Sequence, residues 1–488
     1  MAVRLRRPPR PTATAWWLGG IIALAAANFF WQLGSSSYYV DEALSLDHAV
    51  LPLHLMPHAI NQIEINPWTY FFFLHEWIGH VGSQDEFVTR LPSAVAAALL
   101  VPAVFWMARA FVGTATSLAA AALCAASPLV LQYGQEARAY IFAMLAITVA
   151  VAATVGAVQR AHRQALWLAG GAAAAILSLW LHYASAFVIA PLCVWLITRA
   201  GIPRWRRIAF AGVCLVAELL VMPIFLEQIR LYPNGGLSGI AVFNANNVVA
   251  VLGTPFDGRF SAGINTFRVI AVVLVSASLA RLLLRPPAIR DAHLLAALAA
   301  VPLLAILVLG AVGRDVVATR YTAVAAPLLV TALAAAATGL RPSVAATVAA
   351  GAAATAVWGV VETHQRSGFF APARETIAFI RAHQRPRDVV AVVGRAGDQY
   401  SYDYYGRRQL QPSVQYIVPD QTEQVLAAIR SHRRIWIISQ TRAGTYPRRA
   451  LLKYVGGAMS RFGYRPLDAR EWTTSMSTVL YLTAPGKL

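Results

Sequence analysis

The chain has 488 residues, of which 58% are hydrophobic and only 13% are charged. A soluble domain carries about 25% charged residues, so this composition excludes an ordinary soluble enzyme and indicates a polytopic membrane protein. A formal charge of +19 would suggest nucleic acid as a partner for a soluble protein. For a membrane protein, the side on which the charges lie has to be established first.

Apolar runs long enough to span a bilayer occur eleven times along the chain, although one of them is short. The expected spans are 16–33, 91–111, 114–132, 139–158, 165–183, 185–198, 208–226, 264–284, 292–312, 320–339 and 343–361. We therefore predict a mainly α-helical membrane domain over residues 1–361. It is followed by a soluble α/β domain over residues 362–488.

The arginines predict how this domain is oriented. If the N-terminus is cytoplasmic and the spans alternate, 15 basic residues and one acid fall at the cytoplasmic edges. The first outer loop, residues 34–89, holds seven acids and no lysine or arginine. This asymmetry follows the positive-inside rule, so we expect a multi-pass membrane protein with a cytoplasmic N-terminus and a C-terminal domain outside.

The first loop is far longer than a connection between adjacent spans needs to be. It is only moderately polar, so we expect it to form helices that lie in the membrane interface. Asp41 and Glu42 stand just after the first span, among aromatic residues. Such a pair is ordinarily a solvated loop feature, but a carboxylate held partly desolvated at the interface can act as a general base toward a hydroxyl.

Further charged residues occur at the predicted outer ends of other spans. Glu136 and Arg138 occupy the short turn after the third span, where they either close the turn as an ion pair or bind an anionic group. Arg320 and Tyr321 open the tenth span, and His182 and Tyr183 also face outward in this topology. Because external arginines run against the charge bias, phosphate is the natural ligand for them.

The C-terminal segment contains no spanning run. Its pattern predicts helices at 375–383 and 421–430, and strands at 388–393, 435–439 and 477–483. It carries 19 basic and 9 acidic residues, so its surface could attract an anionic lipid headgroup or glycan.

These motifs, taken in order, resemble those of the membrane-embedded C-type (GT-C) glycosyltransferases, especially bacterial relatives of the protein O-mannosyltransferases in glycosyltransferase family 39. The resemblance covers about residues 10–340. It rests on the segments 41–42, 90–94, 127–128, 135–140 and 320–321 with the Ala-Pro-Leu-Leu run that follows. It implies an enzyme that moves a monosaccharide from a polyprenyl (decaprenyl or undecaprenyl) phosphate to a lipid, glycan or protein acceptor.

The resemblance also implies roles for single residues. Asp41 would be the general base, beside Glu42, and the transfer would invert the anomeric centre. Arg90 would order the site or contact the donor, and Glu136 matches the family's second acidic motif. Arg138 and Arg320 would neutralise the donor phosphate. Mannose is the favoured sugar, with arabinose or another sugar as alternatives.

One departure from the pattern concerns Asn66. Relatives such as the lipid A aminoarabinose transferases carry a basic residue before Pro-Pro-Leu in the first loop, where this chain has Asn66-Pro67-Trp68-Thr69. The phosphate charge must then be balanced by arginines elsewhere. No metal-ligand spacing is present, although a second interpretation has Glu136 and Asp41 bind a divalent metal ion, as in some relatives.

The rival function is a polytopic transporter or flippase for a lipid-linked or anionic substrate. Such a protein would carry charged residues at mid-span depth and inverted repeats. Only Glu218 is an acid that we place well inside a span, and no repeat is visible. The transferase therefore remains the preferred prediction, with no nucleic-acid partner.

Overall fold

The structure is a computed structural model of the whole chain. It describes residues 12–159, 163–231, 241–256, 263–365, 372–393, 399–410, 415–417, 427, 431, 433–442, 463–473 and 476–485. Internal contacts divide the chain into two compact units. The helical unit comprises 1–31, 52–73 and 90–363, and the α/β unit comprises 32–51, 74–89 and 364–488. We describe each unit by itself.

The helical unit holds most of the predicted spans. In the part of the chain that the structure describes, nine helices are long and apolar enough to cross a membrane, and one bent helix pair makes a tenth. A shorter apolar helical segment, Tyr183–Ile197, matches the short predicted run at 185–198. These segments correspond to the eleven predicted runs, so the polytopic helical fold is confirmed.

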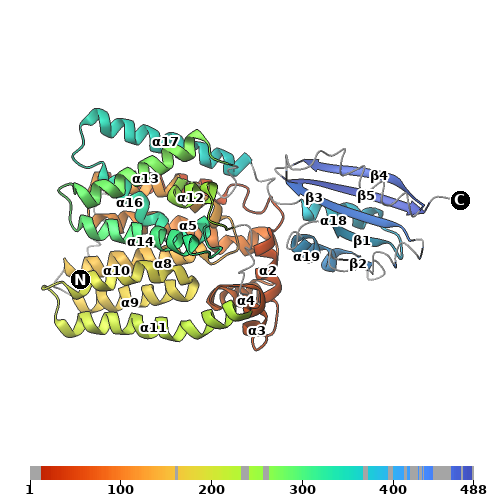
Figure 1. Cartoon of the computed structure of the whole chain (residues 1–488), viewed down its shortest axis with the longest axis horizontal. Coiled ribbons are helices and arrows are strands. Elements are labelled where there is room, and N and C mark those ends of the chain that lie inside the picture. The colour runs from red at the N-terminus through yellow and green to blue at the C-terminus, as the bar shows by residue number, and fades with distance from the viewer. Residues whose placement is uncertain are drawn as a thin grey trace, which may run out of the picture. The chain divides into compact units, whose positions relative to one another are not determined.

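The helices, shown in Figure 1, have the following bounds: α1 Ala13–Phe30, α3 Met56–Ile63, α4 Thr69–Val81, α5 Glu86–Arg109, α6 Thr114–Ala125, α7 Pro128–Gly134, α8 Tyr140–Val158, α9 Gln164–Leu181, α10 Ala186–Ile197, α11 Arg204–Leu231, α12 Ala245–Leu252, α13 Thr266–Leu284, α14 Ala292–Ala311, α15 Thr319–Thr322, α16 Ala326–Ala336 and α17 Pro342–Gln365. Short 3₁₀ turns lie at Tyr183–Ser185, Thr254–Phe256 and Ala323–Ala325.

The predicted span at 114–132 is not one straight helix. It is split into α6 and α7, whose axes are bent by 56°. Ser127 caps α7, because its hydroxyl accepts a hydrogen bond from the Val130 amide (3.3 Å), and Pro128 occupies the first turn. Proline disfavours a helical conformation in the residue before it, so Ser127-Pro128 ends α6 and starts a new helix.

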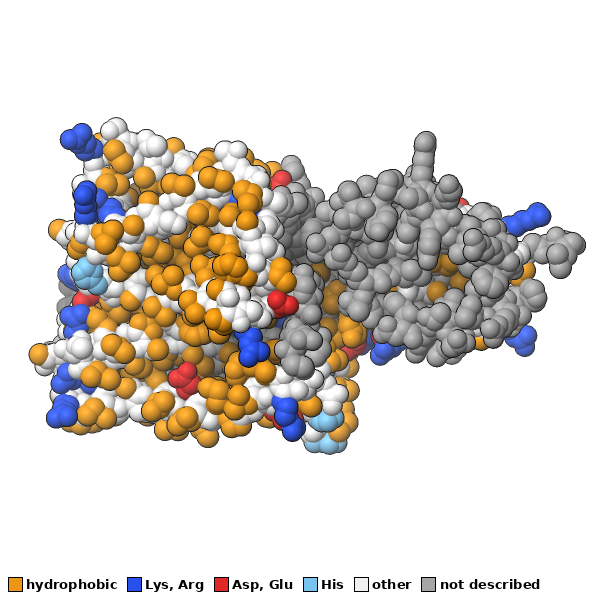
Figure 2. All heavy atoms as spheres, in the orientation of Figure 1, with side chains coloured by type: hydrophobic (Ala, Val, Ile, Leu, Met, Phe, Trp, Pro, Cys, Tyr) orange, Lys and Arg blue, Asp and Glu red, His pale blue; other side chains and the backbone are white. Residues whose placement is uncertain are grey.

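Large apolar side chains cover the outside of the helical unit. Leu215, Leu219 and Leu220 on α11 are all more than half exposed, as is Val273 on α13. Figure 2 shows such side chains as a broad orange belt across the helices, with arginines gathered along the left edge. A continuous apolar surface of this kind is stable only against lipid, so the chain is a multi-pass membrane protein.

Close helix packing fills the interior of this unit. α8 is mostly enclosed within the unit, and α9 packs along it (Figure 1). At the α8–α9 contact, a Cβ atom on Gly171 would lie 2.5 Å from the Thr154 hydroxyl oxygen. Only glycine fits there, which is the small-residue packing typical of membrane helices.

The α/β unit combines segments from the first loop with the C-terminal region. The first loop contributes α2 Val40–Ala49 and part of α4, so the predicted loop helices are confirmed. The C-terminal region contains α18 Ala373–His383, α19 Gln399–Gln409, β1 Val389–Val393, β2 Gln415–Ile417, β3 Ile435–Arg442, β4 Tyr464–Thr473 and β5 Met476–Pro485.

The five strands form one mixed sheet in the order β2-β1-β3-β5-β4. β1 is parallel to both β2 and β3, whereas β5 is antiparallel to β3 and β4. The buried carboxylate of Asp388 fixes the start of β1, because it accepts hydrogen bonds from Arg434 and from the Trp436 indole (both 2.8 Å). The predicted strands at 388–393, 435–439 and 477–483 and the helix at 375–383 are confirmed. Apart from residue 427, the predicted helix at 421–430 lies outside the described residues.

Candidate functional site

Asp41 and Glu42 lie in the first turn of α2, within the α/β unit. Glu42 is fully buried, and its carboxylate accepts a hydrogen bond from the backbone amide of Tyr39 at the helix start (3.0 Å). This contact satisfies an amide that has no partner inside the helix, and the negative charge suits the helix N-terminus. Glu42 thus supports the helix, whereas Asp41 is partly exposed.

Arg138 and Glu64 form a buried ion pair in the helical unit. Arg138 lies in the turn between α7 and α8, and Glu64 caps the end of α3. The guanidinium donates two hydrogen bonds to the carboxylate, at 2.7 and 3.1 Å, and Asn66 donates a third to it at 2.9 Å. The sequence predicted Arg138 as an anion ligand but missed Glu64 as its partner. A buried arginine needs an acidic partner, and the acid-rich first loop was the signal that could have identified it.

Gln228 connects two further predicted residues, Asn66 and Tyr183. Its side chain is fully buried near the end of α11. The amide oxygen accepts a hydrogen bond from the Tyr183 hydroxyl (2.9 Å), and the amide nitrogen donates to Asn61 (3.0 Å) and to the backbone carbonyl of Asn66 (2.9 Å). This glutamine was not predicted, because nothing in the sequence distinguishes it from other polar residues near helix ends.

His182 occupies the turn after α9 and is enclosed by predicted site residues. Its ring centroid lies 5.3 Å from that of Tyr140 and 6.4 Å from that of Tyr321. Burial lowers the pKa of His182 to about 4, and the charges of Arg138 and Arg320 contribute to that shift. The structure therefore brings Arg138, Arg320, His182 and Tyr321 together, and their role in one site stays a prediction.

The protonation of His182 follows from these surroundings. Its Nδ1 accepts a hydrogen bond from the Ala184 amide (3.3 Å), so the neutral ring carries its proton on Nε2. The side chain can then donate a hydrogen bond without adding positive charge to a site that already holds two arginines.

Glu136 and Arg90 are both buried in the helical unit. The Glu136 carboxylate accepts a hydrogen bond from the Gln132 amide (3.0 Å), one turn earlier in the chain. Arg90 is only 1% exposed on α5. Of the ten predicted site residues, Asp41 and Glu42 belong to the α/β unit and the other eight to the helical unit. The single site that would join both sets stays a prediction.

A metal centre was the second interpretation of Glu136 and Asp41. Within the described ranges, no three side chains of His, Cys, Asp or Glu gather closely enough to hold a metal ion. We therefore derive no step through a metal ion.

Part of the chain matches the profile of a known protein family. The profile of the family described as dolichyl-phosphate-mannose-protein mannosyltransferase matches residues 68–226, which include Arg90, Glu136, Arg138 and His182. No curated protein matches the chain in sequence.

Solved structures match almost the full length of the chain. ArnT from Cupriavidus metallidurans, bound to undecaprenyl phosphate, is 13% identical with a TM-score of 0.58; the match covers 96% of this chain and 98% of ArnT. Its apo state gives 12% identity with the same score and coverage. The chain has a GT-C fold. A weaker match, with a TM-score of 0.48 and 11% identity over 87% of this chain and 69% of the other, is the oligosaccharyltransferase AglB from Archaeoglobus fulgidus.

Proposed function

We propose that this GT-C protein transfers a monosaccharide from a polyprenyl-phosphate donor to an acceptor hydroxyl on the outer face of the bacterial plasma membrane. Mannose is the favoured sugar, because the matching family profile is that of enzymes that use dolichyl-phosphate-mannose. The polyprenyl phosphate is supported by the full-length fold similarity to ArnT, which was solved with undecaprenyl phosphate.

One arrangement carries the proposal: His182 lies buried with its ring 5.3 Å from that of Tyr140 and 6.4 Å from that of Tyr321. The charges of Arg138 and Arg320 help to lower the pKa of His182 there. Two guanidinium groups near one buried side chain create a positive potential suited to phosphate. Glu64 already engages Arg138 through two hydrogen bonds, so we assign the first contact with phosphate to Arg320, which is only partly buried. Glu64 fixes the position of Arg138, and the positive charge of Arg138 adds to that of Arg320.

The chemistry of the transfer needs a base and a stabilised leaving group. The acceptor hydroxyl gives its proton to the Asp41 carboxylate while its oxygen bonds to the anomeric carbon of the sugar. The bond from that carbon to the phosphate oxygen breaks, and the polyprenyl phosphate leaves with the electron pair. Attack from the side opposite the phosphate inverts the anomeric centre, and the arginines offset the charge that grows on the departing phosphate.

The remaining predicted residues would hold the donor in place. His182 donates from Nε2 to a phosphate or sugar oxygen, and Tyr321 lies beside it. Asn66 and Tyr183, which share Gln228 as a partner, set the position of the first loop near these groups. Arg90 and Glu136 complete the proposed donor site.

The proposed orientation places the N-terminus in the cytoplasm and the α/β unit outside. Exposed arginines at helix ends and short connections support it, among them Arg204, Arg285, Arg290 and Arg341. Positive residues of this kind are retained on the cytoplasmic side of membrane proteins.

A transfer assay with the purified full-length protein in detergent tests the donor. We expect product from decaprenyl-phosphate-mannose and none from GDP-mannose, with decaprenyl-phosphate-arabinose as the test of the sugar. The Arg320→Met variant should lose about 100-fold or more in rate, as expected for a lost charge-stabilising contact. Glu227→Gln, which alters an exposed ion pair with Arg230, is the control.

Activity only with a nucleotide sugar would refute the proposed donor. A parallel reaction with a chelator tests the metal interpretation, because a loss of rate that added divalent metal restores would require metal ligands.

A further inference from the structure

A cavity of about 630 Å³ opens in the α/β unit, between the first loop and the C-terminal region. Its volume lies within the ~300–1,000 Å³ range of ligand pockets. The first loop contributes Tyr38, Gly79 and Asp85 to the wall, and α18 and α19 contribute Arg374, Tyr405 and Arg408. None of the ten predicted site residues lines this cavity.

The charges around the cavity balance. The lining holds two acidic and two basic side chains, Asp85, Glu86, Arg374 and Arg408, and the remaining polar lining consists of neutral amides and hydroxyls such as those of Gln84, Tyr404 and Gln409. A phosphate or acidic glycan would meet two carboxylates, and a lipid chain would need an apolar wall. A lining that mixes acceptors and donors without net charge suits a ligand rich in hydroxyl groups.

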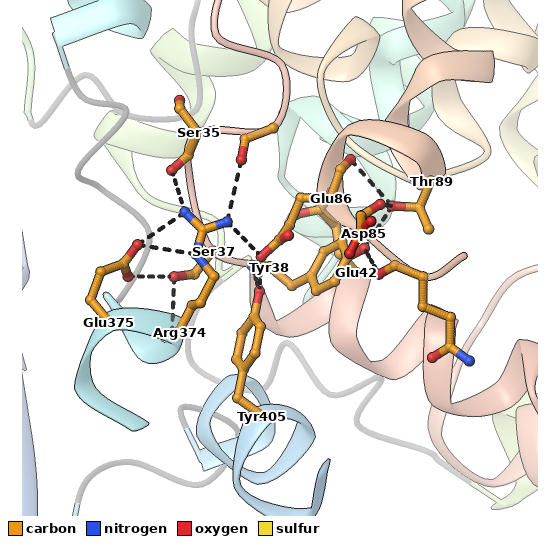
Figure 3. A network of polar contacts seen from close by, with 12 residues as sticks. Ser35, Ser37, Tyr38, Glu42, Asp85, Glu86, Thr89, Arg374, Glu375 and Tyr405 are labelled. Carbon is orange, nitrogen blue, oxygen red and sulfur yellow. Dashed lines mark hydrogen bonds and ion pairs between the residues drawn. The ribbon is translucent and has the colours of Figure 1, made fainter. Parts of the chain in front are cut away.

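The wall of the cavity is built from fixed side chains. Glu86 forms an ion pair with Arg374 (3.0 Å) and accepts a hydrogen bond from the Tyr405 hydroxyl (2.6 Å), as Figure 3 shows. Burial and the charge of Glu86 raise the pKa of Tyr405 well above its usual value, so this hydroxyl stays protonated and donates. Side chains held in this way bind a ligand with little loss of conformational entropy.

The cavity is also tied to the helix that carries Asp41. The Tyr405 hydroxyl accepts a hydrogen bond from the backbone amide of Tyr38 (2.8 Å), and the Tyr38 ring stacks on that of Tyr405 at 6.0 Å. Tyr38 lies just before the start of α2, three residues ahead of Asp41. A molecule bound here would therefore contact the segment that positions the proposed base.

We propose that this cavity binds a neutral oligosaccharide, which is the acceptor of the reaction. That the bound glycan is the acceptor rests on the proposed function, whereas the binding of a neutral glycan rests on the cavity alone. It assigns the C-terminal region a part in acceptor recognition. It also favours a glycan over a lipid or protein acceptor.

Gly79 offers a variant that fills the cavity without disturbing the fold. It lines the cavity from α4, and a Cβ added there would meet no atom within 4 Å. A helical glycine gains stability when it is replaced, so Gly79→Phe should fold. Gly170→Phe is the matched control, because Gly170 is a helical glycine in α9 with equally open space.

The experiment titrates full-length protein in detergent with neutral manno-, arabino- and gluco-oligosaccharides. Oligogalacturonate and a Ser/Thr-rich peptide serve as the acidic and protein probes. We expect a neutral glycan to bind, Gly79→Phe to weaken that binding by about tenfold or more, and Gly170→Phe to leave it unchanged. Asp85→Asn should raise the affinity for oligogalacturonate, because it leaves the lining with a net positive charge.

The outcomes separate this inference from the proposed function. Asp41→Asn should bind the glycan like the wild type while it loses transfer. Glycan binding without transfer from any polyprenyl-phosphate sugar would refute the proposed function and leave the glycan site standing. Preferred binding of the peptide, or undiminished glycan binding by Gly79→Phe, would refute the glycan site.

Discussion

Each unit contains an arginine–glutamate pair, and the two pairs differ in their surroundings. In the helical unit, the side chains of Arg138 and Glu64 are 4% and 9% exposed, and the contact is bidentate. In the α/β unit, the side chains of Arg374 and Glu86 are 33% and 10% exposed. Arg374 also contacts Glu375 and the backbone carbonyl of Ser35 (Figure 3).

This difference separates a concentrated charge from a distributed one. Arg138 makes a bidentate contact with the buried Glu64 carboxylate, and its positive charge contributes to the lowered pKa of His182. Arg374 shares its donors among several acceptors and connects the first loop to residues more than 300 positions later in the chain. We infer that the first pair sets the electrostatics of a donor site, whereas the second holds chain segments together.

The largest effect should follow from removal of the Glu64 charge. Glu64→Gln removes the charge of one partner of a buried, bidentate ion pair, and breaking such a pair costs about 3–5 kcal/mol. The thermal unfolding midpoint of the protein in detergent should fall strongly. Glu227→Gln, in an exposed pair, should change it little. Equal shifts in the two variants would mean that Arg138 and Glu64 are solvated like a surface pair.

Acidification should weaken the helical unit through His182. Its pKa is about 4 in the folded protein, against about 6.5 when unperturbed, so the unfolded chain binds a proton first as the pH falls. Stability that is present above pH 6.5 is therefore lost as the pH falls toward 4, by an amount on the order of 3 kcal/mol.

His182→Asn should flatten this pH dependence in unfolding measurements between pH 7 and 4. His80→Asn, at an exposed position on α4, should leave it intact. A wild-type profile in the His182 variant would show that another group is responsible.

A smaller loss is expected for Tyr405→Phe. Without the hydroxyl, Glu86 keeps Arg374 but loses one donor, and the Tyr38 amide loses its acceptor. A loss of about 1–2 kcal/mol follows from these hydrogen bonds. Hydrogen exchange of the Tyr38 amide should accelerate in this variant. Unchanged exchange would contradict the proposed link between α19 and the start of α2.

The smallest effect should come from the pair of Arg408 and Asp47. Both side chains are about one-third exposed, and Nη2 of Arg408 lies 3.1 Å from Oδ1 of Asp47. Asp47→Asn should cost about 0.2–1 kcal/mol, and salt should reduce that cost. A loss as large as that of Glu64→Gln would show that this unit, too, depends on a concentrated charge.

Much of the fold could be predicted from the sequence, because bilayer thickness fixes span length and the three predicted strands are mostly apolar. The short β2 and the charged β4 were not predicted. The bend at Ser127-Pro128 could have been predicted from the proline, but one continuous span was predicted there. The grouping of residues 32–51 and 74–89 with the C-terminal region could not be predicted. It depends on contacts such as Tyr38 with Tyr405, between residues far apart in the chain.

The charged residues of the candidate site were predicted better than their hydrogen-bond partners. Charge against the topological bias identified Arg138 and Arg320, and the structure places both near His182. The partners Glu64 and Gln228 were missed, because a buried hydrogen-bond partner has no pattern of its own in sequence. Glu42 was grouped with Asp41 only because the two are adjacent, although it supports the helix that carries Asp41.

The central claim is that Asp41 removes the proton of the acceptor hydroxyl. Its most direct test is the rate of sugar transfer from decaprenyl-phosphate-mannose, or from whichever polyprenyl-phosphate sugar proves active, by the Asp41→Asn protein. Glu76→Gln, an exposed carboxylate of the same loop, is the control. We predict a loss of about 10²–10⁴-fold for Asp41→Asn with donor binding retained, and wild-type rates for Glu76→Gln. Transfer by Asp41→Asn at the wild-type rate would contradict the account.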